Sequence, residues 1–242
     1  MSKARAIVRT FAELHAALEP FTERVPRWLF RGHSRGSWAL VPKAGRLRWP
    51  NTNESVDLGW LEAWKRRAIE HVSLPAATDW DWLAIAQHHG FATRLLDWTA
   101  NPLAAAYFAL EQETSENPCI WAYRAHRILD GQTPSTQTPA QHVGVAVFRP
   151  RGVAQRISRQ NALFTVHGPP TLAVVNNLND GDQLERVTFD RASRLKLLRD
   201  LDFYGINRAT LFPDLDGLSS YLNWYAENAF VERAFDDVEL GA

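Results

Sequence analysis

The 242-residue sequence lacks several features that define common protein classes. It has one cysteine, Cys119, so it forms no internal disulfide and is expected in a reducing compartment. Its 27 basic and 27 acidic side chains cancel, so no global positive field attracts nucleic acid, although a local patch is compatible with this balance. No apolar run reaches the length of a membrane span, and the first ten residues lack the apolar core of a signal peptide. These absences predict a cytoplasmic globular protein without a membrane partner, bacterial in style.

Familiar catalytic motifs are missing as well. The sequence has no glycine-rich phosphate loop, no paired cysteines, no His-Glu-x-x-His motif and no nucleophile elbow. His88 and His89 are adjacent, so a helix would point them about 100° apart, and they would not easily hold one metal. We therefore expect no metal site. Cys119 has no histidine at metal or triad spacing, so we interpret it as a small core residue.

The densest group of functional side chains runs from Gln87 to Pro102. This stretch, QHHGFATRLLDWTANP, holds two imidazoles, a guanidinium, a carboxylate, two hydroxyls and two amides among apolar residues. The helical spacing before it ends at Gly90, a natural C-cap, and residues 93–98 are predicted to be extended. Pro102 then begins a buried helix with Asn101 as its N-cap. A polar corner over a buried helix suits a ligand site, and it also suits a structural hydrogen-bond network.

The fold class is predicted to be α+β. Strand and helix patterns do not alternate regularly, so we expect one domain with a mixed or antiparallel sheet of about five to seven short strands, flanked by helices. Residues 1–19 form an N-terminal segment and helix, residues 20–230 the domain, and residues 231–242 a C-terminal tail. Asp214 or Asp216 is most simply the N-cap of the last helix.

Arg31 is conspicuous because it follows three apolar residues at the end of a predicted strand. Gly32 behind it would let a ligand approach the backbone. We predict that Arg31 and Asp97 lie on neighbouring elements. The predicted pocket joins Arg31, Arg94, Asp97 and Gln160, with Trp98, Phe108 or Phe164 as an apolar wall. Guanidinium, carboxylate and amide groups suit phosphates and ribose hydroxyls.

A basic segment follows from Arg35 to Arg48, with Trp38 and Trp49 inside it. The simple interpretation is a solvated loop. The alternative is a non-catalytic nucleotide- or nucleic-acid-binding module, because aromatic rings stack on bases while arginines contact phosphates. A metal-dependent nuclease using Asp97, Asp214 and Asp216 is a third option, and we rank it lowest because no metal spacing is visible.

Several motifs resemble the bacterial FRG-domain family, which takes its name from a Phe-Arg-Gly motif. Phe30-Arg31-Gly32 carries that motif here, and the stretch from Gln87 to Pro102 followed by Ala106-Tyr107-Phe108-Ala109 is similar to its longest block. Residues 160–165 and 205–217 resemble its later blocks. The resemblance covers roughly residues 20 to 225, so residues 20–230 are interpreted as a single FRG-like domain.

A weaker resemblance is to ADP-ribosyltransferase-like domains, which place an arginine or histidine on a first core strand. Hydroxyl residues at a strand end, a helix of the form Ala-x-x-Phe-Ala and a later strand with a catalytic Glu or Gln follow in that family. Here Arg31, then Asp97-Trp98-Thr99 with residues 105–109, are similar in order, and either Glu185 or Gln160 matches the last element. The resemblance implies catalytic roles for Arg31, Arg94, Asp97, Gln160 and Glu185, and binding roles for Gly32, His89, Trp98, Thr99 and Phe108.

The same resemblance implies NAD as the substrate of an ADP-ribosyltransferase or glycohydrolase acting in bacterial conflict, as a toxin or a phage-defence effector. Its acceptor would be a nucleic acid or a protein, and an antitoxin or another defence protein would be a partner. The sequence leaves open whether the protein is catalytic, which residue completes the site, and the oligomeric state.

Overall fold

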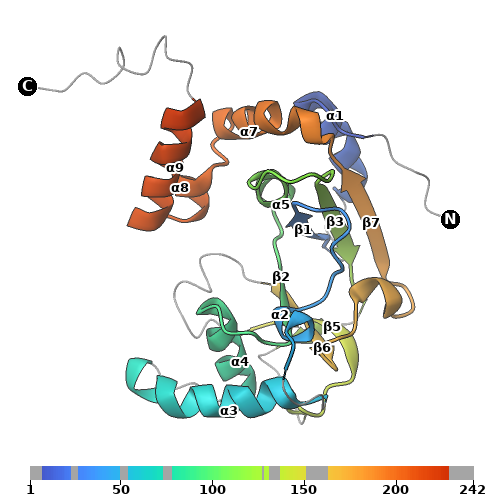
Figure 1. Cartoon of the computed structure of the whole chain (residues 1–242). Helices are drawn as coiled ribbons and strands as arrows, with labels where there is room; N and C mark the ends of the chain where they lie inside the picture. The colour runs from blue at the N-terminus through green and yellow to red at the C-terminus, as the bar shows by residue number, and fades with distance from the viewer. Residues whose placement is uncertain are drawn as a thin grey trace, which may run out of the picture.

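The computed structural model has the predicted α+β architecture (Figure 1). It describes residues 7–22, 27–49, 54–72, 78–126, 128–130, 137–150 and 163–228. The described α-helices are α1 (Phe11–Leu18), α2 (Lys43–Arg46), α3 (Val56–Ala68), α4 (Asp79–His88), α5 (Pro102–Leu110), α7 (Arg194–Phe203), α8 (Arg208–Leu211) and α9 (Leu215–Asn228). Short 3-10 turns lie at Glu19–Phe21, Ile69–His71, Val174–Asn176 and Arg191–Ser193. None of the helices in the described ranges combines the length and hydrophobicity needed to cross a bilayer.

The strands form two sheets rather than the single sheet expected. The first sheet is antiparallel with order β1-β3-β7, and the second is mixed with order β2-β6-β5-β4, in which only the β4–β5 pair is parallel among the described strands. The strands are β1 (Leu29–His33), β2 (Leu95–Trp98), β3 (Cys119–Arg124), β4 (Ile128–Asp130), β5 (Gly144–Arg149), β6 (Leu163–Gly168) and β7 (Gln183–Thr188).

The two sheets meet at one antiparallel bridge between Phe30 of β1 and Thr99, directly after β2. Each residue donates its backbone N–H to the other's carbonyl, at 2.7 and 2.8 Å. No further β1–β2 pairing follows in the described strands, so the two edges separate beyond this point. A sequence pattern that predicts strands does not say where one sheet ends, because that depends on which edges stay in register.

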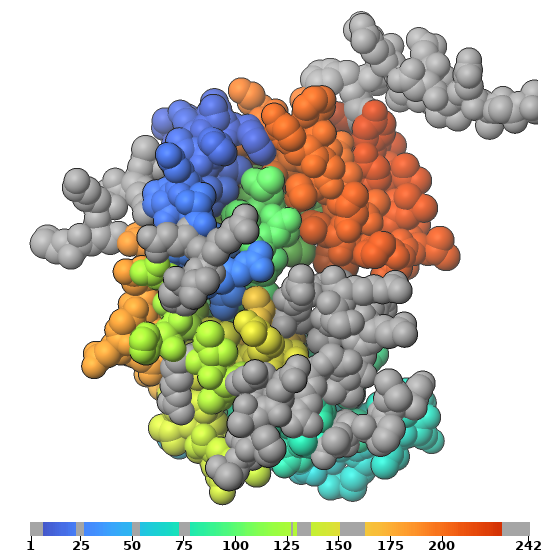
Figure 2. Space-filling view, turned by 180° about the vertical axis from the view of Figure 1, so that it is seen from behind, coloured from blue at the N-terminus to red at the C-terminus, as the bar shows by residue number. Residues whose placement is uncertain are grey.

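Three clusters of buried apolar residues show how the helices and the two sheets are layered. One face of the first sheet packs against α1, α5 and α7 through residues such as Leu14, Ala105 and Leu197. Its other face meets the second sheet, where Tyr123 lies in the same cluster as Trp98. The far face of the second sheet packs against α3 and α4. The molecule therefore has helices at both ends and two sheets between them (Figure 1). Seen from behind, the residues of α1, α7 and α9 lie at the top and those of α3 at the bottom (Figure 2).

Helix ends follow the predicted local chemistry. Asn101 accepts hydrogen bonds from two backbone N–H groups of α5, and Pro102 occupies its first turn. Gly90 has a φ of 79° directly after α4, as a C-cap glycine does. Asp214 accepts from the backbone N–H of Gly217 at 2.8 Å, which confirms its interpretation as a cap.

Gly32 allows α5 to lie directly on β1. A Cβ atom at this position would be 2.1 Å from the carbonyl oxygen of Ala105 and 2.5 Å from the backbone nitrogen of Ala109. Backbone atoms of a buried helix cannot yield easily, so only glycine fits here. We expected a ligand to approach Gly32, and the structure corrects this, since helix α5 occupies that position.

We predict that Gly32→Ala lowers the free energy of unfolding by about 1–3 kcal/mol, the usual cost of overpacking a core. Gly59→Ala is the matched control, because a Cβ there meets nothing within 4 Å on helix α3. It should raise stability by about 0.5–1 kcal/mol through the higher helix propensity of alanine. Chemical denaturation of both variants tests this, and equal effects of the two substitutions would contradict it.

Candidate functional site

The Arg31 side chain lies where β1 and β2 separate. Its Nη1 donates a 2.8 Å hydrogen bond to the backbone carbonyl of Asp97, and the same nitrogen is 3.7 Å from the Asp97 Oδ2. The guanidinium thus binds the β2 edge just beyond the last β1–β2 backbone pair. The predicted proximity of Arg31 and Asp97 is confirmed. Because the Arg31 side chain is 22 % exposed and that of Asp97 is 59 % exposed, both charged groups are within reach of a ligand.

Asp97 is held in turn by two residues of the same sequence stretch. Gln87, near the end of α4, donates from Nε2 to both carboxylate oxygens, at 3.1 and 3.0 Å. Thr93 donates a short hydrogen bond to the Gln87 Oε1, and its Oγ1 accepts from the backbone N–H of Leu95. This chain of contacts fixes both the orientation of the Gln87 amide and the position of the carboxylate.

His33 lies beside Arg31 on the same face of β1, two residues along the strand. The Arg31 Nε donates to the His33 Nε2 at 3.2 Å, so the neutral ring carries its proton on Nδ1. Burial, followed by the positive charge of Arg31, lowers the pKa of His33 to about 4. Burial also lowers the pKa of Arg31, with Asp97 opposing the shift and Arg46 adding to it. An arginine remains protonated at physiological pH, so the site keeps a fixed cation next to a neutral acceptor.

Arg94 is not part of this site. Its Nε and Nη2 bind the two carboxylate oxygens of Asp57 at 2.9 and 2.7 Å, and Nη1 donates to the carbonyl of Pro139. The Arg94 side chain is only 2 % exposed. We expected Arg94 to converge with Arg31. Instead it ties α3 and the segment before β5 to the start of β2, which is the structural network that the sequence left open.

Glu185 lies on the opposite face of the first sheet from Arg31. In register, Phe30, Ala122 and Glu185 form one row across β1, β3 and β7, and Arg31, Trp121 and Arg186 form the next row. Cross-strand partners share a face and successive residues alternate, so the two rows point in opposite directions. The structure therefore does not bring Glu185 together with Arg31. The other candidate for this role, Gln160, lies outside the described residues.

The remaining predicted binding residues occupy separate environments. His89 is an exposed residue at the C-cap of α4. Thr99 makes the β1–β2 bridge, and its hydroxyl accepts from the backbone N–H of Asn101.

The three aromatic residues of the predicted wall also lie apart. The Trp98 ring is buried against Tyr123, and its Nε1 donates to the Thr165 hydroxyl. The Phe108 ring contacts Phe212, and Phe164 is buried in the cluster beneath α4. The three alternatives for the wall thus pack against different neighbours.

The acidic residues of the proposed nuclease site are also separated. Asp214 and Asp216 lie at the start of α9, and Asp97 is on β2. Within the described ranges, no three His, Cys, Asp or Glu side chains are grouped so that they could hold a metal ion. Cys119 is buried in β3, and burial raises the pKa of its thiol to about 11, as for an unreactive core cysteine.

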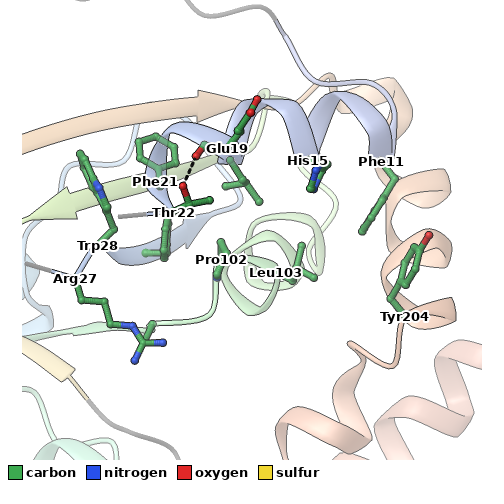
Figure 3. Close-up of a pocket in the computed structure, with 13 residues that line it drawn as sticks. Phe11, His15, Glu19, Phe21, Thr22, Arg27, Trp28, Pro102, Leu103 and Tyr204 are labelled. Carbon is green, nitrogen blue, oxygen red and sulfur yellow. Dashed lines mark hydrogen bonds between the residues drawn. The ribbon is translucent and has the colours of Figure 1, made fainter. Parts of the chain in front are cut away.

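An apolar groove of about 810 Å³ opens between α1 and α5 (Figure 3). Phe11 and Tyr204 lie at one end of it, and Trp28 lies with Arg27 at the other. Trp28 and Phe30 line this groove from the face of β1 opposite Arg31. It is therefore not the predicted pocket.

Sequence reasoning did not select His33, Gln87 or Arg46 as site residues. His33 had a usable signal, because a residue two positions from Arg31 on a strand shares its face. Gln87 begins the densest stretch of functional side chains and Arg46 lies in the basic segment, but their positions near Asp97 and Arg31 depend on how α4 and α2 pack.

Comparison with known families identifies a domain in this chain. Residues 26–118 match the FRG domain, a stretch that includes β1, α2–α5 and the approach to β3. The match confirms the resemblance carried by Phe30-Arg31-Gly32 and the Gln87–Pro102 stretch. No curated protein and no solved structure is significantly similar to the chain.

We predict that substitution of Arg94 lowers the stability of the protein strongly, whereas substitution of Arg31 changes it little. Arg94→Gln should lower the free energy of unfolding by about 3–5 kcal/mol, because it leaves the Asp57 carboxylate buried without its charge partner. Arg31→Gln should cost less than about 1 kcal/mol, because Asp97 is exposed and water replaces the lost contact. Urea denaturation measures both values, and a larger loss for Arg31→Gln would show that Arg31 is structural.

Acidification should destabilise the protein through His33. Its folded-state pKa of about 4 is below the ordinary value of 6.5, so between these values the unfolded chain binds a proton that the folded chain does not. Stability is therefore lost as the pH falls from about 6.5 to about 4. His33→Gln should reduce this loss by on the order of 2 kcal/mol, measured by urea denaturation at neutral and acidic pH. An unchanged pH dependence would contradict the assignment.

Proposed function

Starting from the FRG domain at residues 26–118, we propose that the Arg31 site binds NAD and transfers its ADP-ribosyl group. The observation that carries the proposal is the pair of a half-buried Arg31 and an exposed Asp97 at the point where the two sheets separate. A guanidinium binds phosphate oxygens through paired hydrogen bonds, and a carboxylate suits a ribose hydroxyl or a developing positive centre. Both groups are needed in one site for a substrate that joins a diphosphate to a ribose.

Each side chain of the site has a defined role in the proposed reaction. The bond between nicotinamide and ribose breaks, and neutral nicotinamide leaves with the electron pair. The ribose carbon then has oxocarbenium character, which the Asp97 carboxylate stabilises electrostatically. An acceptor oxygen, from water or from a second substrate, bonds to that carbon, and its proton passes to Asp97. Arg31 holds the diphosphate, and Gln87 and Thr93 keep the carboxylate in position.

Three features of the site support this assignment over a structural ion pair. Asp97 is more than half exposed, although both of its oxygens receive hydrogen bonds from Gln87. His33 accepts from the Nε of Arg31 and so orients its guanidinium. Arg46 adds a second positive charge nearby, since it depresses the pKa of both Arg31 and His33. A structural pair would not need this additional cation, whereas a diphosphate would benefit from it.

The biological setting forms part of the proposal. An enzyme that consumes NAD or modifies a cellular acceptor suits a toxin or phage-defence effector acting in the cytoplasm. Such an activity requires restraint in the producing cell, which an antitoxin or another defence protein would provide.

Incubation of the purified protein with NAD tests the proposal by nicotinamide release, with and without nucleic acid and lysate protein as acceptors. Arg31→Gln should weaken NAD binding by about tenfold or more, because a charge-assisted hydrogen bond contributes about 1.5–3 kcal/mol. Asp97→Asn should retain binding in a thermal-shift assay but lose turnover, because an amide neither carries the charge nor takes the proton.

Glu185→Gln is the matched control, because Glu185 faces away from Arg31 and its substitution should leave turnover unchanged. Loss of turnover in Glu185→Gln alone would contradict the assignment of Asp97. Absence of both nicotinamide release and stabilisation by NAD would overturn the proposed function.

A further inference from the structure

A band of tryptophans and arginines passes the Arg31 site. Trp60 of α3 stacks on Trp49 with ring centroids 6.4 Å apart, and the Trp49 Nε1 donates to the Ala44 carbonyl in α2 at 2.7 Å. Beyond α2, Trp38 contacts His33 edge to face at 6.0 Å. We call this band the tryptophan strip, and its members are Arg35, Trp38, Arg46, Arg48, Trp49 and Trp60.

Two rings of the strip are open to solvent. Trp38 is 42 % exposed and Trp60 is 50 % exposed. Tryptophan is highly buried on average, so two rings this exposed leave indole surface available to a partner. The contacts that each ring makes leave part of it free to stack, and every base offers a flat face to such a ring.

The charge of this region is positive although that of the whole chain is zero. Lys65 is paired with Glu62 and Asp79, and Arg94 is paired with the buried Asp57. The exposed cations of residues 35–67 are Arg35, Lys43, Arg46, Arg48, Arg66 and Arg67. Glu54 and Glu62 are exposed carboxylates of the same stretch, and Glu116 lies close enough to Arg35 for the two charges to interact, so cations still outnumber carboxylates.

Aromatic rings and cations lie close together in the strip. Arg35 lies over the Trp38 ring at 5.8 Å. Trp49 and Trp60 form the stacked pair of the strip, and Arg46 of α2 is close enough to Arg31 and His33 to lower the pKa of both. Aromatic rings and cations therefore occur together beside Arg31, as binding to bases joined by phosphates requires.

We infer that the tryptophan strip binds single-stranded nucleic acid and presents one nucleotide of it to the Arg31 site. Stacking on Trp38 and Trp60 requires unpaired bases, so a duplex fits this surface less well. An acidic peptide would use the arginines but would leave the two rings unused. The role of this strand as the acceptor of an ADP-ribosyl group rests on the proposed function, whereas the binding itself does not.

The test is fluorescence anisotropy of a labelled oligo(dT) of roughly 20 nucleotides, longer than the ~4–16 nucleotides that one binding fold covers. No NAD is added, so the result is independent of the proposed reaction. The affinity should fall linearly with salt on logarithmic axes, because bound phosphates release counterions. Trp60→Ala should weaken binding about tenfold, and Arg48→Gln should weaken it while reducing the salt slope by about one.

Two variants of residues far from the strip are the matched controls. Phe203→Ala removes an 83 % exposed ring from α7, and Lys196→Gln removes an exposed cation from the same helix. Both should bind the oligonucleotide as the wild type does. Circular dichroism confirms that Trp60→Ala is folded, and Arg48→Gln supplies an independent result where it is not.

Three outcomes would overturn the inference. The first is that the strip variants bind as the wild type does, and the second is that the controls are weakened equally. The third is that a blunt duplex or a polyglutamate peptide of the same charge binds as tightly as oligo(dT). If the strip variants bind as the wild type does while NAD turnover on water persists, the proposed function stands without this inference. If the strip variants lose binding while no NAD turnover is found, the inference stands without the proposed function.

Discussion

The single bridge between Phe30 and Thr99 is the constraint on which the rest of the arrangement depends. It holds the edges of two sheets together at one point and lets them separate immediately afterwards. A separated strand edge leaves backbone groups that need partners. Arg31 supplies one of these partners by donating to the Asp97 carbonyl, and its charge reaches the opening for the same reason.

The three residues of the Phe-Arg-Gly motif follow from this position on the strand. Side chains alternate between faces, so Phe30 enters the core beneath α5 while Arg31 points to the opening. Gly32 returns to the helix side, where α5 lies too close for any Cβ atom. Phe30 therefore anchors β1 in the core, Arg31 reaches the site, and Gly32 leaves room for α5. Each residue of the motif has a separate physical reason.

Arg94 of the Gln87–Pro102 stretch and Arg31 of the Phe-Arg-Gly motif illustrate how burial decides the role of an arginine. Arg94 is buried with Asp57 and makes four hydrogen bonds, so it is closed to a ligand. Arg31 makes fewer contacts and keeps access to solvent. Both are arginines near a carboxylate, and their sequence contexts do not distinguish them.

Local chemistry in the sequence determined the α+β class, the caps at Asn101 and Gly90, the buried helix α5 and the match of residues 26–118 to the FRG domain. Each depends on neighbouring residues, so a single chain segment contains the information. Tertiary structure alone decided that the strands form two sheets, that Arg94 pairs with Asp57, and that Glu185 faces away from Arg31. These outcomes depend on register and packing between segments distant in sequence, because a shift of one residue in a strand turns every side chain to the other face.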